Sequence, residues 1–553
     1  MTSRRATQPN SRPTNWSIGD YCTRVDRAAT AHNRVAPLAA TPSEEILPAM
    51  KPSSHGGSNT SRLSCADLFR ASTPWFGAPK TRMPSELVPP GLVPGRGPGL
   101  CPGAGSGRKA HGAEAGHDDN GESVHQVLQS KSVPRTVLRS RGEGEQRLAS
   151  RASLALDNLR AFVILLVLSF HSVLAYLNFL PASPFPFDSP PYLWRAFPIV
   201  DTARWFGFDL FCAWQDVFLM SLFFFLSGLF VWRSLERKRT RTFLYDRIVR
   251  LGVPFAFVVA LLMPLANYPT YLQTAADPSF IAFSRDWLAL PFWPCGPMWF
   301  LWLLLVADFA AAALHRFAPE WGDALIRFSS FAGARPMRYF AAFVMASALA
   351  YVPLAVAFTP SVWVAIGPFG FQLSRPLHYA VYFFAGMGLG ACGIERGLFA
   401  PDGVLVRGWV IWPIAALGSL LLWMALTALA MGDAGSPSLG LQILDDLSFV
   451  LACFGNCFAV LALVLRFAGK RLPVLDALKR DAYGMYLVHY GFVVWLQYAL
   501  LGAALFAVVK GAIVFAGTLL LSWGTIAAVR RIPPAAQVIG VDRPKGAPHG
   551  AAA

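Results

Sequence analysis

The chain has 553 residues, of which 54% are hydrophobic and only 14% are charged. Soluble globular domains carry about 25% charged residues, so this composition excludes an ordinary soluble protein and predicts an integral membrane protein. The formal net charge is +16, but the basic residues lie in the N-terminal tail and in loops between apolar segments, as the positive-inside rule expects. Because no nucleic-acid-binding motif accompanies the charge, we expect no nucleic acid as a partner.

Residues 1–150 form a basic segment rich in Pro, Gly and Ser, as in LVPPGLVPGRGPGLCPGAGSGRKAHG. No apolar period persists there, so the segment cannot bury a core and is predicted to be a disordered tail. It also lacks the apolar region of a signal peptide. We expect either a dispensable tail or wrongly included upstream sequence. A membrane domain is expected over residues 151–530, and a short disordered cytoplasmic tail over 531–553.

Apolar segments long enough to cross a bilayer recur from residue 150 onward. A helix of about 20 residues spans a hydrocarbon layer about 30 Å thick, which predicts an all-α polytopic bundle of about ten transmembrane helices. The region 270–296 is expected to be a loop with a re-entrant or interfacial piece. The predicted spans are 158–178, 208–232, 250–268, 297–315, 338–358, 376–394, 408–431, 444–467, 483–501 and 505–529.

The charges of the loops predict the orientation of this bundle. Basic segments precede the first span and follow the second, the eighth and the tenth, whereas the loop after the seventh span, GDAGSPSLGLQI, is weakly charged. The basic segments all fall on one side of the predicted membrane. The positive-inside rule therefore places both termini in the cytoplasm.

The first span carries two residues that are costly in a bilayer, Arg160 and His171. Three helical turns take about 10.8 residues, so the two side chains share one face and lie about 16 Å apart along the axis. Ionisable residues in membrane spans mark functional sites by default. A neutral imidazole can accept a proton near neutral pH, which is what a general base for an alcohol needs. The alternative role of His171 is a structural hydrogen bond to a neighbouring helix.

Three arginines lie at the predicted cytoplasmic mouth of the bundle. Arg160 has Asp157 one turn earlier, so it either snorkels within an ion pair or contributes to an anion site. Arg247 and Arg250 lie one turn apart at the start of the third span. They either anchor that span or bind a phosphate-rich ligand through forked, charge-assisted hydrogen bonds.

Other polar and aromatic residues in the spans have several candidate roles. Asp216 in the second span has no obvious local partner, and is expected to be buried against another polar group or near the outer interface. Trp299 fits an interfacial aromatic belt as well as the wall of a site. Tyr486 and His489 lie one turn apart on the ninth span. Lys510 is expected to snorkel to the outer surface.

The eight cysteines include no CxxC pair, so we expect neither a bound metal nor a disulfide framework. Cys453 and Cys457 lie one helical turn apart in an apolar run and are expected to pack. Ser227 and Gly228 in the second span permit the close approach of another helix.

Five sequence blocks, taken in order, resemble the acyltransferase-3 family of integral membrane acyltransferases. They are LDNLRAFVILLVLSFH, LFFFLSGLF, FLYDRIVRLGVPF, GPMWFLWLLL and DAYGMYLVH, with YAVYFFAGMGLG as a weaker sixth. The text around FFFLSG and GPMWFLW is similar to the branch that includes the glucan-succinylating C protein of bacterial envelopes. The resemblance implies an enzyme of the bacterial inner membrane. It would transfer an acetyl- or succinyl-type group from acyl-coenzyme A to a hydroxyl of an envelope glycan or related acceptor.

The resemblance also implies roles for individual residues. His171 matches the essential histidine of the family and Arg160 its paired arginine, while Arg247 and Arg250 match an Arg-x-x-Arg pair after the second span. We expect the arginines to bind the phosphates of the donor and His171 to deprotonate the acceptor. Acyl-coenzyme A is a substrate here, and no bound cofactor is expected. Candidate supporting residues are Asp216, Trp299, Tyr486 and His489.

A transporter or flippase for a glycan or lipid precursor is the alternative function. Ten spans with an internal polar stripe also suit transport, but the sequence shows no clear internal repeat and no paired broken helices, which many transporters have. Direct transfer and transfer through a covalent enzyme intermediate are both compatible with the residues of the first span. The sequence does not predict an oligomeric state.

Overall fold

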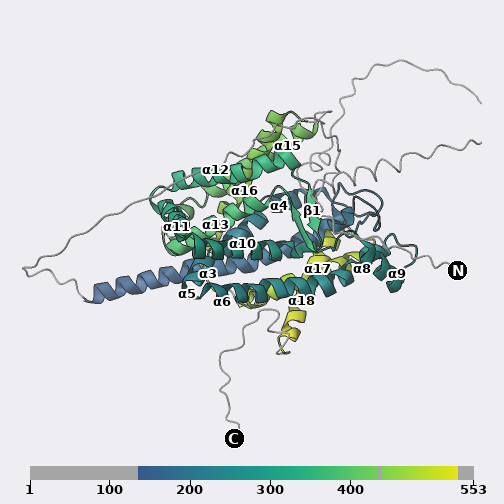
Figure 1. Ribbon diagram of the computed structural model, residues 1–553, viewed down its shortest axis with the longest axis horizontal. Coiled ribbons are helices and arrows are strands. Elements are labelled where there is room, and N and C mark those ends of the chain that lie inside the picture. Colours follow the sequence, from purple (N-terminus) through teal and green to yellow (C-terminus); the bar gives the residue numbers. More distant parts are fainter. Residues whose placement is uncertain (1–134, 401, 433–436, 472, 533–553) are drawn as a thin grey trace, which may run out of the picture. The chain divides into compact units, whose positions relative to one another are not determined.

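Most of the described chain is helical, which confirms the predicted all-α membrane bundle (Figure 1). The described strands form one antiparallel hairpin, β1 (Trp363–Ile366) and β2 (Phe369–Gln372). The structure is a computed structural model that gives side chains from residue 151 onward and describes residues 135–400, 402–432, 437–471 and 473–532.

The helices follow the predicted spans, with further helices between them, and two π-helical turns, η3 and η4, lie within the third span. Their order and bounds are α3 (Arg135–Val173), η1 (Leu174–Tyr176), η2 (Leu193–Arg195), α4 (Phe206–Gly228), α5 (Val231–Arg237), α6 (Thr240–Arg247), η3 (Ile248–Gly252), α7 (Val253–Phe257), η4 (Val258–Leu262), α8 (Met263–Leu272), α9 (Phe280–Ala289), η5 (Gly296–Met298), α10 (Trp299–Phe317), α11 (Pro319–Ala334), α12 (Pro336–Phe358), α13 (Pro376–Cys392), η6 (Gly397–Phe399), α14 (Val404–Arg407), α15 (Ile411–Gly432), α16 (Leu439–Phe467), α17 (Pro473–Ala499) and α18 (Ala507–Val529).

Within the described residues, eight helical segments are long and apolar enough to cross a membrane, or nine if a bent pair that begins with α13 counts as one span. Each of the ten predicted spans nevertheless corresponds to a helical segment. The predicted span that is not among the eight or nine is α17, which carries buried polar residues such as His489 and Gln497. Because α17 packs against α3, α8 and α18, it does not need a continuous apolar surface.

The first span belongs to a helix that starts before the predicted domain boundary at residue 150. Helix α3 begins at Arg135, and its membrane-crossing part, with η1, is Arg151–Tyr176. Residues 1–134 and 533–553, which hold most of the two predicted tails, lie outside the described residues. The predicted interfacial region at 270–296 contains the ten-residue helix α9.

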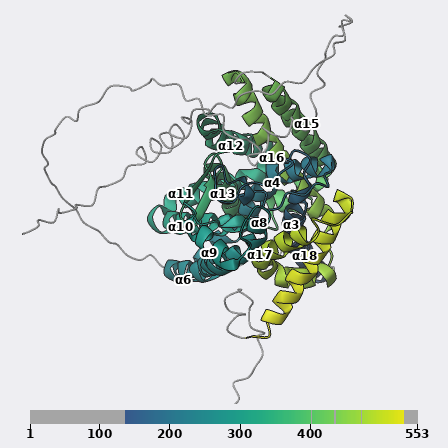
Figure 2. The ribbon, with the colours of Figure 1, turned by 90° about the vertical axis from the view of Figure 1, so that its right-hand side faces the viewer.

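Helix α3 lies inside the bundle and packs against α4, α16, α17 and α18 (Figures 1 and 2). Helices α15 and α18 lie at the periphery in Figure 2, and they are the least buried of the candidate spans. Their exposed apolar faces suit contact with lipid tails. The end of α3 that carries His171 is therefore enclosed by other helices, whereas Arg160 remains partly exposed.

Helices α4 and α13 approach each other closely through glycines. A side-chain carbon added at Gly228 would overlap the carbonyl oxygen of Phe383, and one added at Gly386 would overlap that of Phe225. Small residues at such crossings let two backbones meet at van der Waals distance. The close approach predicted at Gly228 is thus confirmed, and its partner is α13.

The prediction that Lys510 snorkels to the outer surface is wrong. Its Nζ lies 2.7 Å from the carboxylate of Asp201, and the two side chains are 2% and 0% exposed. Asp201 lies in the loop between α3 and α4, 309 residues away along the chain. A lysine finds a partner inside the protein here, and this partner cannot be recognised from local sequence.

Replacing Gly386 with Ala is expected to lower the free energy of unfolding by about 1–3 kcal/mol, because the added methyl group forces α4 and α13 apart. The matched control is Gly418→Ala on α15, where no heavy atom lies within 4 Å of the added carbon. Thermal unfolding in detergent measures both variants. Equal melting temperatures for wild type and Gly386→Ala would contradict the close approach.

Candidate active site

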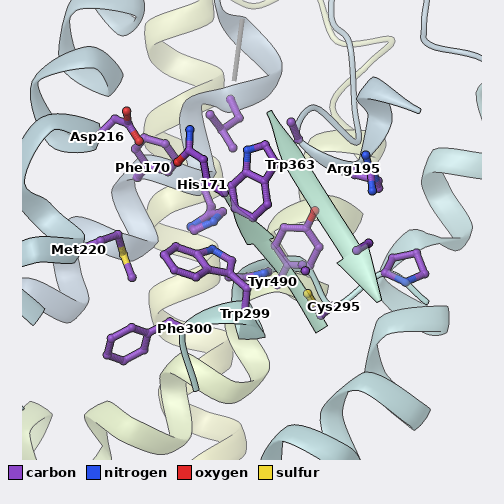
Figure 3. A pocket seen from close by; sticks show the side chains of 18 of the residues that line it. Phe170, His171, Arg195, Asp216, Met220, Cys295, Trp299, Phe300, Trp363 and Tyr490 are labelled. Carbon is purple, nitrogen blue, oxygen red and sulfur yellow. The ribbon is translucent and has the colours of Figure 1, made fainter. Parts of the chain in front are cut away.

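A cavity of about 350 Å³ lies among α3, α4, α10, α13 and α17, next to the loops at one end of these helices. The rings of His171, Trp299, Trp363 and Tyr490 gather around this space (Figure 3). The loop between α3 and α4, the segment before α10 and the β hairpin complete its walls. The cavity thus lies beyond His171 as seen from Arg160, at the opposite end of the span.

His171 reaches the cavity from the last turn of α3, and its backbone sets its tautomer. Nδ1 lies 2.9 Å from the carbonyl oxygen of Val167, one turn earlier. A carbonyl oxygen only accepts hydrogen bonds, so Nδ1 carries the hydrogen and Nε2 keeps a lone pair. Gln497 of α17 donates to the carbonyl oxygen of His171 over 2.9 Å and holds this turn in place. The arrangement provides an imidazole that can accept a proton at Nε2.

A second histidine lies against the first. The ring centroids of His171 and His489 are 5.1 Å apart, and the rings meet at 65°. Nδ1 of His489 donates to the carbonyl oxygen of Tyr486 over 2.6 Å, and its buried Nε2 has no hydrogen-bond partner among the described residues. The two imidazoles therefore have the same tautomer, and His489 supports His171 from behind the cavity wall.

Asp216 lines the cavity and is paired with a buried arginine. The nearest contact is 2.8 Å, from Nη2 of Arg375 to the carboxylate, and Nη1 also donates to the backbone carbonyl of Asp216 over 3.1 Å. Arg375 lies just before α13, is 2% exposed and stacks over the ring of Phe449. Of the two environments predicted for Asp216, burial against a polar group is confirmed. The other charged residue of the lining is Arg195, which stacks over Phe292.

Aromatic rings form much of the remaining wall. Trp299 at the start of α10 lines the cavity, which favours the predicted wall over the interfacial belt. Its ring stacks with Tyr379, with centroids 5.9 Å apart, and meets Trp363 edge to face at 5.8 Å. Trp302 donates to the carbonyl oxygen of Gly370 over 3.1 Å and attaches the hairpin to α10.

Tyr486 also belongs to the lining, as expected for a supporting residue. Its hydroxyl donates to the carbonyl oxygen of Pro297, just before α10. This contact joins α17 to the segment that carries Trp299. Tyr486 and His489 therefore support the cavity from one helix, at successive turns.

The three arginines lie away from the cavity, and none of them lines it. Arg160 is 43% exposed, pairs with Asp157 at 3.2 Å and stacks over the ring of Phe230 at 4.0 Å. The ion pair predicted for Arg160 is thus present. The structure separates an end of the bundle that bears Arg160 from the cavity that bears His171.

Arg247 and Arg250 take part in the packing of the third span. Nε of Arg247 lies 3.4 Å from the carboxylate of Asp308 on α10, a side chain that is 1% exposed. Arg250 lies within the π-helical turn η3, where its backbone carbonyl accepts a hydrogen bond from the hydroxyl of Tyr483 on α17. The guanidinium of Arg247 therefore already neutralises a buried carboxylate.

Several residues of the cavity were not predicted from the sequence, including Gln215, Trp363, Tyr379 and Tyr490. Some of them had a recognisable signal. Gln215 is an amide inside an apolar span, next to Asp216. An uncharged polar residue in a span can indicate a functional site, as a charged one does. Two short apolar runs around a Gly-Pro turn predict the hairpin. Tyr379 and Tyr490 look like ordinary packing residues in the sequence.

The fold and the cavity define a polytopic membrane protein with a polar site enclosed by its helices. A family model described as an acyltransferase domain matches residues 153–527, which is more than half of the chain. The chain therefore belongs to the acyltransferase-3 family and is a membrane acyltransferase. None of the curated proteins and none of the solved structures matches it.

Replacing Arg375 with Met is expected to cost about 3–5 kcal/mol of stability, because it leaves the carboxylate of Asp216 buried without a counter-charge. The double variant Asp216→Asn with Arg375→Met removes both charges and should regain most of that loss. Denaturant titration in detergent measures the free energy of unfolding of the single and double variants. If the double variant were no more stable than Arg375→Met, the loss of stability would not come from an unpaired charge on Asp216.

Proposed function

We propose that this acyltransferase moves an acetyl- or succinyl-type group from acyl-coenzyme A to a hydroxyl of an envelope glycan or related acceptor, with His171 as the general base. The observation that carries the proposal is the lone pair of His171 Nε2 at a cavity, held by the hydrogen bond from Nδ1 to Val167. The family match supports acyl transfer. No observation on the described residues favours a transporter.

The proposed reaction is a direct transfer. Nε2 of His171 takes the proton of the acceptor hydroxyl while the oxygen forms a bond to the thioester carbonyl carbon. The carbon–sulfur bond then breaks, and the leaving thiolate of coenzyme A receives a proton from the imidazolium. A general base of this kind typically accelerates a reaction about 10²–10⁴-fold. His489 supports the imidazole without touching the substrate.

A covalent intermediate on the cysteine of the cavity has less support. Cys295 lines the cavity just before η5, and burial raises the pKa of its thiol to about 11. The thiolate is the nucleophilic form of cysteine. Because the thiol stays protonated at neutral pH, Cys295 suits packing better than acyl transfer, and direct attack by the acceptor is the simpler path.

Donor and acceptor are proposed to enter from opposite ends of the bundle. We further propose that the end with Arg160 faces the cytoplasm, together with both termini, in a bacterial inner membrane. The positive charges of the loops support this orientation. Arginines at that end suit the phosphates of coenzyme A. The cavity lies toward the other end and suits the acceptor, so the acyl group meets it at His171. Arg160 is the best candidate for the donor, because its ion pair with Asp157 is exposed, whereas Arg247 is paired with the buried carboxylate of Asp308.

Replacing His171 with Ala should lower kcat about 10²–10⁴-fold in correctly inserted protein, because the proton acceptor is lost. The matched control is His315→Ala at the end of α10, outside the cavity lining. Transfer of a radiolabelled acyl group from acyl-coenzyme A to an isolated glycan fraction measures both. Turnover of His171→Ala like that of wild type would rule out the general base, and acceptor movement without acyl transfer would favour a transporter.

Replacing Arg160 with Ala should raise KM for acyl-coenzyme A about tenfold to hundredfold, the loss expected for hydrogen bonds to a charged group. Stability should barely change, because an exposed ion pair such as that with Asp157 contributes at most about 1 kcal/mol. Arg407→Ala is the control, since it removes a second arginine from an exposed pair, with Asp402 at 3.6 Å. A change in KM for the acceptor alone would contradict the donor role.

A further inference from the structure

The amide of Gln215 lies in the wall of the cavity without any partner. Gln215 is 0% exposed, and among the described residues neither Nε2 nor Oε1 has a hydrogen-bond partner. It nevertheless lines the cavity, as does Leu219 one turn further along α4. Its neighbour Asp216 is paired instead with Arg375, which donates to both its carboxylate and its backbone carbonyl.

An unpaired amide is expensive at such a position. Mutational data put the cost of burying an unsatisfied polar group at about 1–3 kcal/mol. A methionine at position 215 has a similar length and avoids this cost, and apolar residues already surround it in the wall, such as Leu219 and Met220. A side chain that destabilises the empty protein in this way is typical of a binding site, where stability is traded for function.

The chemistry of the amide indicates what it binds. It offers two hydrogens and one acceptor oxygen, and two neighbouring hydroxyls can satisfy both kinds of atom at once. The adjacent carboxylate of Asp216 is neutralised by Arg375, so this part of the wall suits a neutral ligand. The rings of Trp299, Trp363 and Tyr379 provide flat apolar faces in the same cavity, against which the C–H face of a sugar ring can pack.

We propose that Gln215 is a positioning residue that binds the hydroxyl next to the one that is acylated. This inference rests on the proposed function and names the specificity determinant of the acceptor. Gln215 holds the acceptor ring so that the reacting hydroxyl faces Nε2 of His171. Acceptors with adjacent hydroxyls are thereby preferred over those in which the neighbouring hydroxyl is missing.

The amides of the pantetheine arm of coenzyme A have a similar donor and acceptor pattern. They are the less favoured ligand, because the donor is proposed to enter from the end with Arg160, whereas Gln215 lies in the cavity beyond His171 together with the loops. The two ligands differ in a measurable way. Loss of the amide changes KM for the acceptor in one case and KM for acyl-coenzyme A in the other.

The test compares Gln215→Met with Thr518→Val. Thr518 on α18 is also 0% exposed with an unpartnered hydroxyl, but it lies outside the cavity lining. Both variants remove an unsatisfied buried polar group, so both should melt at the same temperature as wild type or higher. Only Gln215→Met should raise KM for a short glucose oligosaccharide as acceptor, about tenfold or more, with KM for acyl-coenzyme A unchanged.

A second measurement uses the same oligosaccharide without the hydroxyl next to the acylated position. Wild type should use it at least tenfold less efficiently than the parent, whereas Gln215→Met should no longer distinguish the two. If Gln215→Met does not insert, Gln215→Leu replaces it. An unchanged KM for the acceptor would overturn the proposal at any melting temperature, because the amide would then make no bond to the acceptor.

An increase in KM for acyl-coenzyme A alone would also overturn the proposal and assign Gln215 to the donor. Failure of the underlying function is recognised separately. Wild-type protein would then transfer no acyl group to any glycan, and His171→Ala would behave like wild type. In contrast, a wrong assignment of Gln215 leaves wild-type transfer and its dependence on His171 intact.

Discussion

A charged side chain inside a membrane span needs a partner within the protein, because the hydrocarbon core offers none. In the described part of the chain, two buried pairs of opposite charge meet this need between segments that are distant in sequence. Asp216 on α4 pairs with Arg375 before α13, and Lys510 on α18 pairs with Asp201 in the loop after α3. Each pair links two segments of the bundle, and Asp216 of the first pair also lines the cavity that contains His171.

Backbone carbonyl groups of the spans fix the tautomer and the ring orientation of the two histidines in the same way. His171 and His489 each donate from Nδ1 to a carbonyl oxygen of their own helix, so neither ring can rotate without losing a bond. Two cationic rings with centroids 5.1 Å apart would repel each other strongly. This repulsion disfavours protonation of both rings at once. A pair that carries at most one proton suits the proposed role of His171, which takes a proton from an alcohol and returns it to a leaving thiolate.

Much of the fold could be predicted from sequence, because apolar length acts locally. The positions of the ten predicted helical segments follow from it, and the pairing of Arg160 with Asp157 was one of two alternatives that their spacing offered. The cavity was only partly predictable: His171, Asp216 and Tyr486 were recognised in their apolar spans, whereas Gln215, Tyr379 and Tyr490 were not. The partners of Asp216 and Lys510 were out of reach, because pairing across 159 and 309 residues leaves no local pattern.

The two π-helical turns of the third span affect how the sequence of this segment has to be aligned with that of a homologue. A turn closed by bonds from residue i to i+5 takes up an extra residue, so each one rotates the following side chains by about 100° relative to a regular helix. Helical spacing rules therefore fail between Arg247, which pairs with Asp308, and Asn267, which lines the cavity. A homologue with one residue fewer at η3 or η4 could keep the same helix by closing that turn as an α-turn. An alignment gap in this span would therefore change which face of the helix the following side chains occupy, while the span itself would keep its length.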